Sequence, residues 1–560
     1  MAAKDLPSSA DYIIIGGGLA GCTLASRLHQ YSPNLSILLI EAGPDPTGNP
    51  LVTNPLACFA AHGSDIDWNY TTVPQKHLDN RSTYASAGKI LSGGTATNYG
   101  TWTRGPKADY DLWAKIVGDE SWSYEGLLPY FKRTETYHGE REDEGEKHYG
   151  FEGAIHAVSV GASSEKRRYP LRESVRSAWE KVGVKYTTDA NAGNPLGMTE
   201  LVENWRDGKR QLACEAYDLS GVHVVTDTLV QKVVIEDQGG EKTATGVQLA
   251  DGRVIKAGKE VIVSAGAYRT PQVLMLSGIG PTAELGKVGI SVAFDSPFVG
   301  QNFFDHLNCF MFWKLRRPDE GLALGTTLWK DPAYFMGFPC DWIVSERTPD
   351  AEMEAALKVD GDEKDTHELL DPNRCHTESM VCYSPGGFSF AKMDVPMDGT
   401  YISALVVGMV PTSRGSITIS STSPADSPVI DPNFYATEVD RAAMRAGFRQ
   451  LLRLFQDTPE GQEMVETEMA PEGYPKLNAK STDEEIDHRI RRMGNTLFHP
   501  AGSASMGKVV DTKLRVKGVQ RLRVVDASVM PSCPCAHFQV PVYAIAEKAA
   551  DMIAGRNAAK

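Results

Sequence analysis

At 560 residues the chain is longer than one compact core usually grows, so two structural domains are expected. Hydrophobic residues make up 41% and charged residues 23%, values typical of globular proteins, which excludes a largely disordered chain. A net charge of −15 without long Lys/Arg runs argues against binding to nucleic acid or to an anionic membrane surface.

The N-terminus lacks the basic start, apolar stretch and small-residue cleavage site of a secretory signal. No early uncharged run reaches the roughly 20 residues of a membrane-spanning helix. A cytoplasmic protein without membrane contact is therefore expected. Nine cysteines, an odd number in a long chain, fit reduced thiols better than a disulfide framework.

The first forty residues predict the start of a doubly wound α/β sheet. A short β-branched run at 11–15 (DYIII) precedes the glycine-rich segment 16–21 (GGGLAG). A helix-like segment at 22–28 follows, and a second apolar run at 36–40 (SILLI) ends in Glu41. The order strand, turn, helix, strand occupies about thirty residues, as in dinucleotide-binding folds.

The spacing Gly16-x-Gly18-x-x-Gly21 has a mechanical reason. The first glycine permits a tight turn, the second lets a pyrophosphate approach the backbone, and the third lets helix and strand pack closely. The helix N-terminus then offers free N–H groups to the anion. Glu41, twenty residues after Gly21, can accept ribose hydroxyl hydrogen bonds. The motif predicts dinucleotide binding without separating NAD from FAD.

Five later segments of the chain carry a family resemblance. They are residues 88–105, 266–280 (GAYRTPQVLMLSGIG), 411–415, 498–506 (FHPAGSASM) and 522–528 (LRVVDAS). The first two resemble the two signatures of the glucose–methanol–choline (GMC) oxidoreductases, and the other three are similar to segments from the later half of that family. All of them occur in family order, and the chain resembles the His–His active-site type found in aryl-alcohol and glucose oxidising members.

The resemblance implies an α/β fold with a Rossmann-like FAD-binding domain and a second α+β substrate domain whose antiparallel sheet is covered by helices. It assigns residues 1–160, 214–305 and 496–560 to the FAD-binding domain. Residues 161–213 and 306–495 form the substrate-binding domain, where specificity is expected. The charged stretch 348–376 is interpreted as a solvated surface insertion.

FAD is the implied cofactor. Ser92 stands where the family usually has glycine, and Thr97 stands where some members carry a histidine bonded covalently to the flavin. Because threonine cannot form that bond, we predict non-covalent FAD. For residues 266–280 both a structural helix end and a direct cofactor contact remain open. The predicted cofactor contacts are Gly16, Gly18, Leu19, Ala20, Gly21, Glu41, Ala42, Gly88, Leu91, Gly93, Gly94, Thr95, Asn98, Tyr99, Gly100, Thr101, Val230, Asp526, Ala527, Gln539 and Val540.

His499 and His537 match the active-site pair of the family. Oxidation of an alcohol removes a hydroxyl proton and a carbon-bound hydride, so a base that titrates near neutrality is needed. His499 is expected to be the principal base and His537 to position the hydroxyl, although the roles could be shared. Trp102, Phe388 and Phe538 are weaker candidates for the substrate pocket.

The resemblance implies oxidation of a primary or secondary alcohol, aryl or allylic, to a carbonyl by proton abstraction and hydride transfer to flavin N5. The electron acceptor, O2 or another acceptor, is left open. A lyase on the same fold and a non-catalytic flavin protein are the alternatives. No metal site is expected, since Cys533-Pro-Cys535 lacks the spacing and the second cysteine pair of a zinc site.

Overall fold

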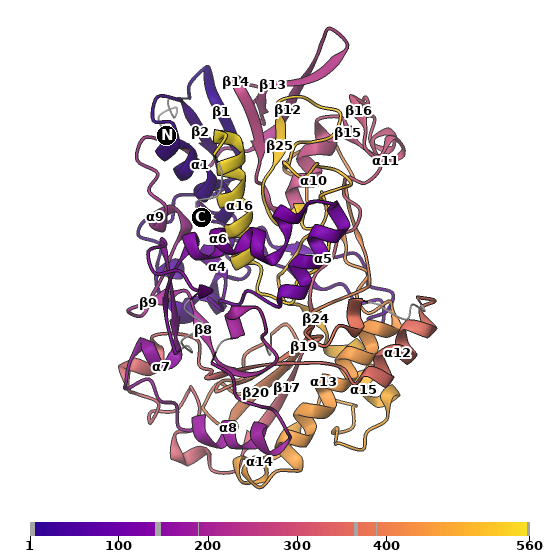
Figure 1. Cartoon of the computed structure of the whole chain (residues 1–560). Coiled ribbons are helices and arrows are strands. Elements are labelled where there is room, and N and C mark those ends of the chain that lie inside the picture. The colour runs from indigo at the N-terminus through magenta and orange to yellow at the C-terminus, as the bar shows by residue number, and fades with distance from the viewer. Residues whose placement is uncertain (1–5, 141–146, 189, 363–367, 388, 557–560) are drawn as a thin grey trace.

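The computed structural model describes residues 6–140, 147–188, 190–362, 368–387 and 389–556. Two large sheets organise the chain (Figure 1). One lies in the upper half of the view and the other in the lower half, and segments distant in sequence contribute to each. The model thus has the two-part α/β architecture expected from the sequence.

The first sheet has the strand order β11-β2-β1-β14-β13-β12, and β25 also pairs with β14. Its parallel strands are β1 (Ser9–Ile15), β2 (Ile37–Ile40), β11 (His223–Val225), β14 (Val254–Val263) and β25 (Leu522–Val524). An antiparallel extension is formed by β12 (Val230–Gln238) and β13 (Glu241–Leu249). The aliphatic runs of β1 and β2 are buried, as is usual for parallel strands covered on both faces.

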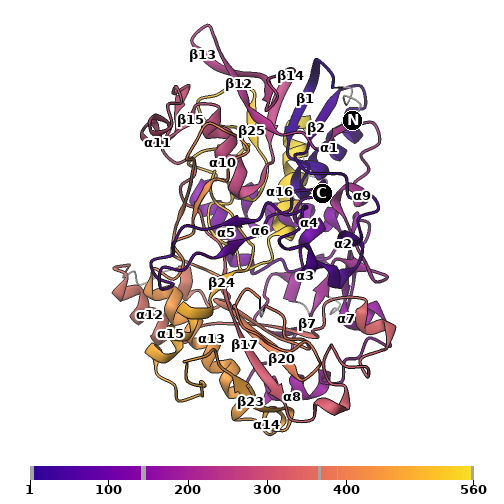
Figure 2. The ribbon, with the colours of Figure 1, turned by 180° about the vertical axis from the view of Figure 1, so that it is seen from behind.

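Helix α1 (Leu19–Tyr31) follows β1 through the glycine-rich turn, as predicted. It packs against α16 (Gln539–Ala554), the last helix of the chain, and Figure 2 shows both beside β1 and β2. The second signature segment forms α10 (Gly266–Leu276) after β14. The N-termini of α1, α10 and α16 are therefore brought to one region of the first sheet.

The second sheet is antiparallel, with the order β23-β17-β20-β19-β18-β7 and β24 paired to β17. Helix α13 (Glu438–Gln456) packs on β19 and β20, and the other helices of this half surround it (Figure 2). The predicted antiparallel sheet with a helical cover is confirmed. The strands are β7 (Gly197–Glu200), β17 (Leu307–Leu315), β18 (Trp342–Glu346), β19 (Thr377–Cys382), β20 (Tyr401–Gly408), β23 (Val465–Met469) and β24 (Asn495–Thr496).

Shorter elements connect the two halves. The remaining helices are α2 (Pro50–Thr53), α3 (Cys58–Ala61), α4 (Gly94–Thr97), α5 (Lys107–Val117), α6 (Tyr124–Thr134), α7 (Val160–Ser163), α8 (Arg172–Lys181), α9 (Ala213–Ala216), α11 (Thr282–Lys287), α12 (Asp350–Val359), α14 (Pro459–Met464) and α15 (Asp483–Met493). The remaining strands are β3 (Tyr70–Thr71), β4 (Tyr84–Ala85), β5 (Glu135–His138), β6 (Ile155–Ser159), β8 (Val202–Glu203), β9 (Trp205–Arg206), β10 (Lys209–Arg210), β15 (Ile279–Gly280), β16 (Phe294–Asp295), β21 (Ser416–Thr418) and β22 (Val429–Asp431).

One expectation about the chain was borne out in part and another was wrong. The charged stretch 348–376 contains α12, whose charged face is exposed as expected of a solvated helix face, but the apolar face of α12 is buried and the stretch ends in buried Arg374, Cys375 and His376. The cysteines are not all reduced thiols, because Cys375 and Cys535 form a disulfide and the other seven are free. No spacing pattern in the sequence signals a bond between residues 160 positions apart.

The strands of the first sheet fall inside the ranges predicted for cofactor binding, and those of the second sheet have their long members between 307 and 469. The exact domain boundaries stay a prediction. No helix in the described part of the chain combines the length and apolar character needed to cross a membrane.

Candidate active site

A cavity of about 360 Å³ lies between the two sheets. Ile15, Ile40 and Val230 contribute to it from the first sheet, and Phe310 and Met380 from the second. One part is bounded by glycine-rich turns, whereas the other is bounded mainly by aromatic rings and by the two predicted histidines. The cavity is therefore one continuous space in which a large ligand and a smaller ligand can lie side by side.

The glycine-rich turn after β1 cannot accommodate side chains at the predicted positions. Gly16 has a φ of +102°, and a Cβ there would lie 2.4 Å from the carbonyl oxygen of Ser264. A Cβ on Gly21 would lie 2.0 Å from the carbonyl oxygen of Gly16. Both glycines are therefore required by close packing of the turn, the mechanical role expected for them.

Glu41 ends β2 and lines the same part of the cavity. Its carboxylate accepts hydrogen bonds from the backbone N–H groups of Gly17 and Gly43, each at 2.8 Å. Burial raises the pKa of Glu41 to about 7 despite these bonds. The acid is thus fixed at the cavity wall, where it can meet the ribose hydroxyls of a dinucleotide.

A second turn, from the first signature segment, lies directly on the first. The Ser92 N–H donates to the carbonyl oxygen of Gly17 at 2.7 Å. Gly93 has a φ of +52°, and a Cβ there would lie 2.8 Å from the Cα of Gly18. The Ser92 hydroxyl accepts from the Cys214 N–H at 3.0 Å, so this departure from the family pattern serves an internal contact. The two turns form a cradle of exposed backbone that fits a pyrophosphate.

Most of the predicted cofactor residues line the cavity. The exceptions are buried behind its wall: Gly21 and Leu91 pack against the first turn, the Thr95 hydroxyl donates to the Ser92 carbonyl, and Val540 lies within α16. The lining members are Gly16, Gly18, Leu19, Ala20, Glu41, Ala42, Gly88, Gly93, Gly94, Asn98, Tyr99, Gly100, Thr101, Val230, Asp526, Ala527 and Gln539.

The second signature segment contributes at its beginning and not at its end. Gly266, Ala267, Tyr268 and Arg269, in the first turn of α10, line the cavity. Residues 277–280 form the helix end and β15, outside the lining. Of the two interpretations left open by the sequence, the structural one therefore fits 277–280, while the helix start is available for contact.

The rings of His499 and His537 lie next to each other in the cavity, with centroids 4.9 Å apart and planes at 86°. Nδ1 of His499 is 2.9 Å from Nδ1 of His306, a residue that precedes β17. Nε2 of His537 is 2.8 Å from a carboxylate oxygen of Glu378 on β19. Each of the two histidines thus has one ring nitrogen held by a neighbouring side chain. The second ring nitrogen of each has no hydrogen-bond partner among the described residues.

Burial, followed by the nearby His537 and His306, lowers the pKa of His499 well below its usual range. His499 is therefore neutral, which is the form that can accept a proton. The backbone N–H of His499 donates to the carboxylate of Asp305 at 2.9 Å, which fixes this part of the loop.

The neighbours of His306 define which nitrogen of His499 carries the proton. His306 Nε2 lies 3.0 Å from the sulfur of Cys533, whose thiol points to the carbonyl oxygen of Met409 at 3.6 Å. The sulfur then accepts from His306 Nε2–H, and His306 Nδ1 accepts from His499 Nδ1–H. This assignment leaves the lone pair of His499 Nε2 free.

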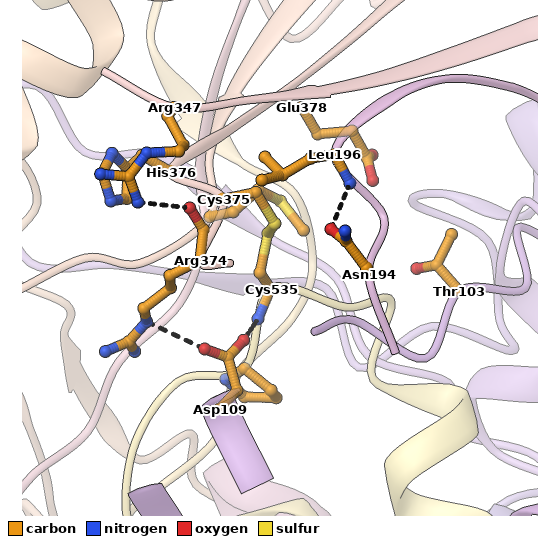
Figure 3. The surroundings of a disulfide bond; sticks show 12 residues. Thr103, Asp109, Asn194, Leu196, Arg347, Arg374, Cys375, His376, Glu378 and Cys535 are labelled. Carbon is orange, nitrogen blue, oxygen red and sulfur yellow. Dashed lines mark hydrogen bonds and ion pairs between the residues drawn. A yellow bond between two sulfur atoms is a disulfide. The ribbon is translucent and has the colours of Figure 1, made fainter. Parts of the chain in front are cut away.

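A disulfide supports the His537–Glu378 pair, and Figure 3 shows this disulfide with Glu378 nearby. The disulfide joins Cys535, two residues before His537, to Cys375, three residues before Glu378. Asp109 accepts from the Cys535 N–H at 2.6 Å and pairs with the Arg374 guanidinium at 2.9 Å. The loop and the strand that carry the pair are thereby tied together.

The three residues predicted to line the substrate pocket differ in where the structure places them. Phe538 lines the cavity and stacks on His499, with centroids 4.9 Å apart. Trp102 was a wrong candidate: it is fully buried in the core, where its Nε1–H donates to Glu135 at 2.8 Å, and it is not part of the cavity wall. Phe388 lies outside the described residues. The rings that do form the aromatic part are Phe59, Tyr99, Phe310, Phe338, Phe390 and Phe498. Of these, the sequence analysis named Tyr99, as a cofactor contact, and predicted none of them as part of the substrate pocket.

Cys535 is held in the disulfide with Cys375, which leaves Cys533 as the free thiol of the Cys533–Cys535 segment. Within the described ranges, no group of three or more His, Cys, Asp or Glu side chains could hold a metal ion. Sequence reasoning also missed Asp305, His306 and Glu378. Of these, Glu378 offered a signal, since it is an acid within the otherwise uncharged strand TESMVC.

Comparison with known proteins is consistent with this geometry. Two models for GMC oxidoreductases match the chain, one over residues 10–308 and the other over 411–546. The GMC-type oxidoreductase acuG of Aspergillus aculeatus is 43% identical, covering 97% of this chain and 98% of its own. Pyranose dehydrogenase 2 of Leucoagaricus meleagris is 31% identical, covering 98% and 94%. A crystal structure of formate oxidase is 30% identical, covers 98% of each chain and superposes with a TM-score of 0.87.

Proposed function

This chain belongs to the GMC oxidoreductase family, and we propose that it oxidises an aryl or allylic alcohol to the carbonyl compound with non-covalently held FAD. The observation that carries the proposal is the placement of a neutral His499 beside the Glu378-paired His537, in an aromatic cavity continuous with the glycine cradle. The electron acceptor is O2 or another acceptor.

GMC oxidoreductases use FAD, and the cradle fits it. Gly18 and Gly93 approach so closely that a Cβ on Gly93 would collide with the facing backbone, which leaves backbone N–H groups open to phosphates. When bound, FAD supplies the acceptor for the hydride. Thr97 lines the cavity and has no ring nitrogen with which to bond the cofactor, which supports non-covalent binding.

The two histidines have different roles toward the substrate hydroxyl group. The alcohol O–H donates to the free Nε2 of His499, which takes the proton as the carbon-bound hydrogen leaves with its electron pair. The carboxylate of Glu378 holds His537 through Nε2 at 2.8 Å, so the His537 ring is fixed in the cavity to position the alcohol. One histidine therefore takes the proton, and the other orients the same hydroxyl group.

The aromatic lining supports an aryl or allylic substrate. A sugar would bring several hydroxyl groups into a wall made mainly of rings, and unpaired buried hydroxyls are costly. A flat unsaturated group instead stacks on rings such as Phe498 and Phe538, the latter already stacked on His499 with an angle of 24° between the ring planes. Pyranose dehydrogenase 2 and formate oxidase are named for a pyranose and for formate. The aryl or allylic substrate class is therefore proposed from the cavity of this chain and is not taken from these relatives.

Anaerobic reduction of the bound flavin by a panel of substrates tests the proposal. Benzyl and cinnamyl alcohol are expected to bleach the flavin faster than hexanol, glucose or formate at equal concentration. Fastest bleaching by glucose or formate would overturn the substrate class. A yellow protein that none of them bleaches would favour the lyase alternative. The rate at which colour returns in air separates an oxidase from a dehydrogenase.

A further inference from the structure

One wall of the cavity carries polar side chains that the oxidation step does not use. Nε2 of His62 lies 2.7 Å from the hydroxyl oxygen of Tyr99, and both residues line the cavity. On the other side, Nδ1 of His62 lies 3.5 Å from the hydroxyl of Tyr84, which donates to Asp67. The four side chains form a single polar series that runs from Asp67 to Tyr99.

The direction of each hydrogen bond in this series can be assigned. Asp67 also accepts three backbone N–H bonds, at 3.0 Å each, and acts as an acceptor throughout. The single hydroxyl proton of Tyr84 goes to Asp67, so the Tyr84 oxygen is an acceptor. This oxygen accepts from the Gly63 N–H at 3.0 Å and from Nδ1–H of His62 at 3.5 Å. Burial lowers the pKa of His62 to about 4, so the ring is neutral and its Nε2 is an acceptor.

The last bond of the series leaves Tyr99 with a defined polarity. Burial raises the pKa of the Tyr99 phenol well above its usual range, so the hydroxyl keeps its proton. That proton is donated to Nε2 of His62. The Tyr99 oxygen therefore presents lone pairs and no proton to any further partner.

The surroundings of this oxygen are apolar. The ring of Tyr99 contacts Phe59 and Phe338, with centroids 5.3 and 5.9 Å away. The ring of His62 contacts Phe390 and Phe498 at 5.1 and 4.9 Å. An acceptor in such a wall gains from a donor brought by a ligand, because the wall offers few others.

This acceptor and the proposed base line the same cavity. Phe498, whose ring contacts His62, directly precedes His499 in the chain. Phe498 has a φ of +63°, a conformation that bulky residues rarely adopt, and both Phe498 and His499 line the cavity. A single flat molecule can therefore contact both positions.

We propose that the Tyr99 oxygen is a specificity-determining acceptor for a second hydroxyl group of the substrate, so that the substrate is an aromatic alcohol that also bears a phenolic hydroxyl. This inference rests on the proposed function, which supplies the alcohol that is oxidised. Since the Tyr99 oxygen has no proton to offer, the subsite selects a hydroxyl and disfavours a methoxy group at the same place.

Binding of phenol and anisole to the oxidised holoenzyme, measured by calorimetry, tests the subsite without turnover. The two probes differ in whether the oxygen attached to the ring carries a proton or a methyl group. One hydrogen bond corresponds to about a five- to tenfold lower Kd for phenol in the unmodified protein. In Tyr99→Phe the two Kd values are expected to become equal. In Tyr401→Phe, which removes a phenol outside the cavity, the preference should persist.

A second variant keeps the test informative if Tyr99→Phe does not fold. In His62→Phe the Tyr99 hydroxyl loses its acceptor and can donate to anisole, so the preference for phenol should vanish or reverse. Equal binding of both probes by the unmodified protein, or a preference that survives both variants, would overturn the subsite. If phenol is preferred but no aromatic alcohol reduces the flavin, the proposed function fails and the subsite stands.

Discussion

His499 and His537 are the same residue type in one cavity, yet their neighbours differ in charge. His537 faces the carboxylate of Glu378, whereas His499 faces the neutral ring of His306. Burial beside the neutral ring of His306 lowers the pKa of His499, so this imidazole stays uncharged and can accept a proton. The local partners thus support the proposed role of His499 as the base.

Replacing the proposed base should affect chemistry and spare the cofactor. In His499→Ala, anaerobic flavin reduction by benzyl alcohol is expected to slow by about 10²- to 10⁴-fold, the usual contribution of a general base. The flavin spectrum should be retained, because the glycine cradle does not involve this ring. His223→Ala, at an exposed position on β11, is the control. A loss of less than tenfold in His499→Ala would contradict the assignment.

The pH dependence follows from the lowered pKa of His499. Protonation would abolish its ability to accept the substrate proton, so activity falls only as the pH drops through that pKa. Because burial places the pKa well below the usual histidine value of about 6.5, kcat/KM should be level between pH 8 and about 6.5. An acid limb centred near pH 7 in steady-state assays would show that another group controls the step.

At the scale of elements, two turns meet where the cofactor cradle forms. Gly93→Ala would force a Cβ to within 2.8 Å of the Gly18 Cα, in a backbone conformation that disfavours L side chains. The turns should separate, and the ratio of bound flavin to protein should fall well below that of the unmodified protein. Gly286→Ala, in α11 where a Cβ meets open space, should retain full flavin content. Equal flavin content in both variants would argue against the cradle.

The disulfide connects the loop of His537 with the strand of Glu378. In the double variant Cys375→Ser/Cys535→Ser, flavin reduction should slow, because the imidazole–carboxylate pair loses its tether. The midpoint of thermal unfolding should fall by several degrees, as expected when about 2–4 kcal/mol of disulfide stabilisation is removed. Cys340→Ser, at a buried free cysteine, is the matched control. Unchanged rates in the double variant would show that the tether does not position His537.

Alkylation of the denatured protein checks the bond itself. Seven cysteines should react before reduction and nine after it. Disulfides are unusual in the reducing cytoplasm, so seven reactive cysteines before reduction would argue against the cytoplasmic location that was expected. If all nine cysteines react without reduction, the disulfide between Cys375 and Cys535 does not form.

At the scale of the whole molecule, the sequence predicted the parts that depend on local patterns. The β1–turn–α1–β2 unit follows from hydrophobic runs and glycine spacing, and the family resemblance supplied the second sheet. The contacts that define the site are long-range: His306 meets His499 and Glu378 meets His537 across 193 and 159 residues. No periodicity encodes such pairs. Trp102 was wrongly assigned to the substrate pocket because the sequence does not distinguish an aromatic residue that lines a cavity from one that fills a core.

The central claim is that one cavity holds FAD beside a histidine base that activates an alcohol. The most direct measurement is the visible spectrum of the purified protein before and after anaerobic addition of benzyl alcohol, made in parallel on His499→Ala. The account predicts a flavin spectrum in both proteins and bleaching within the time of observation only in the unmodified one. A protein that binds no FAD, or a flavin bleached equally fast in both, would contradict it.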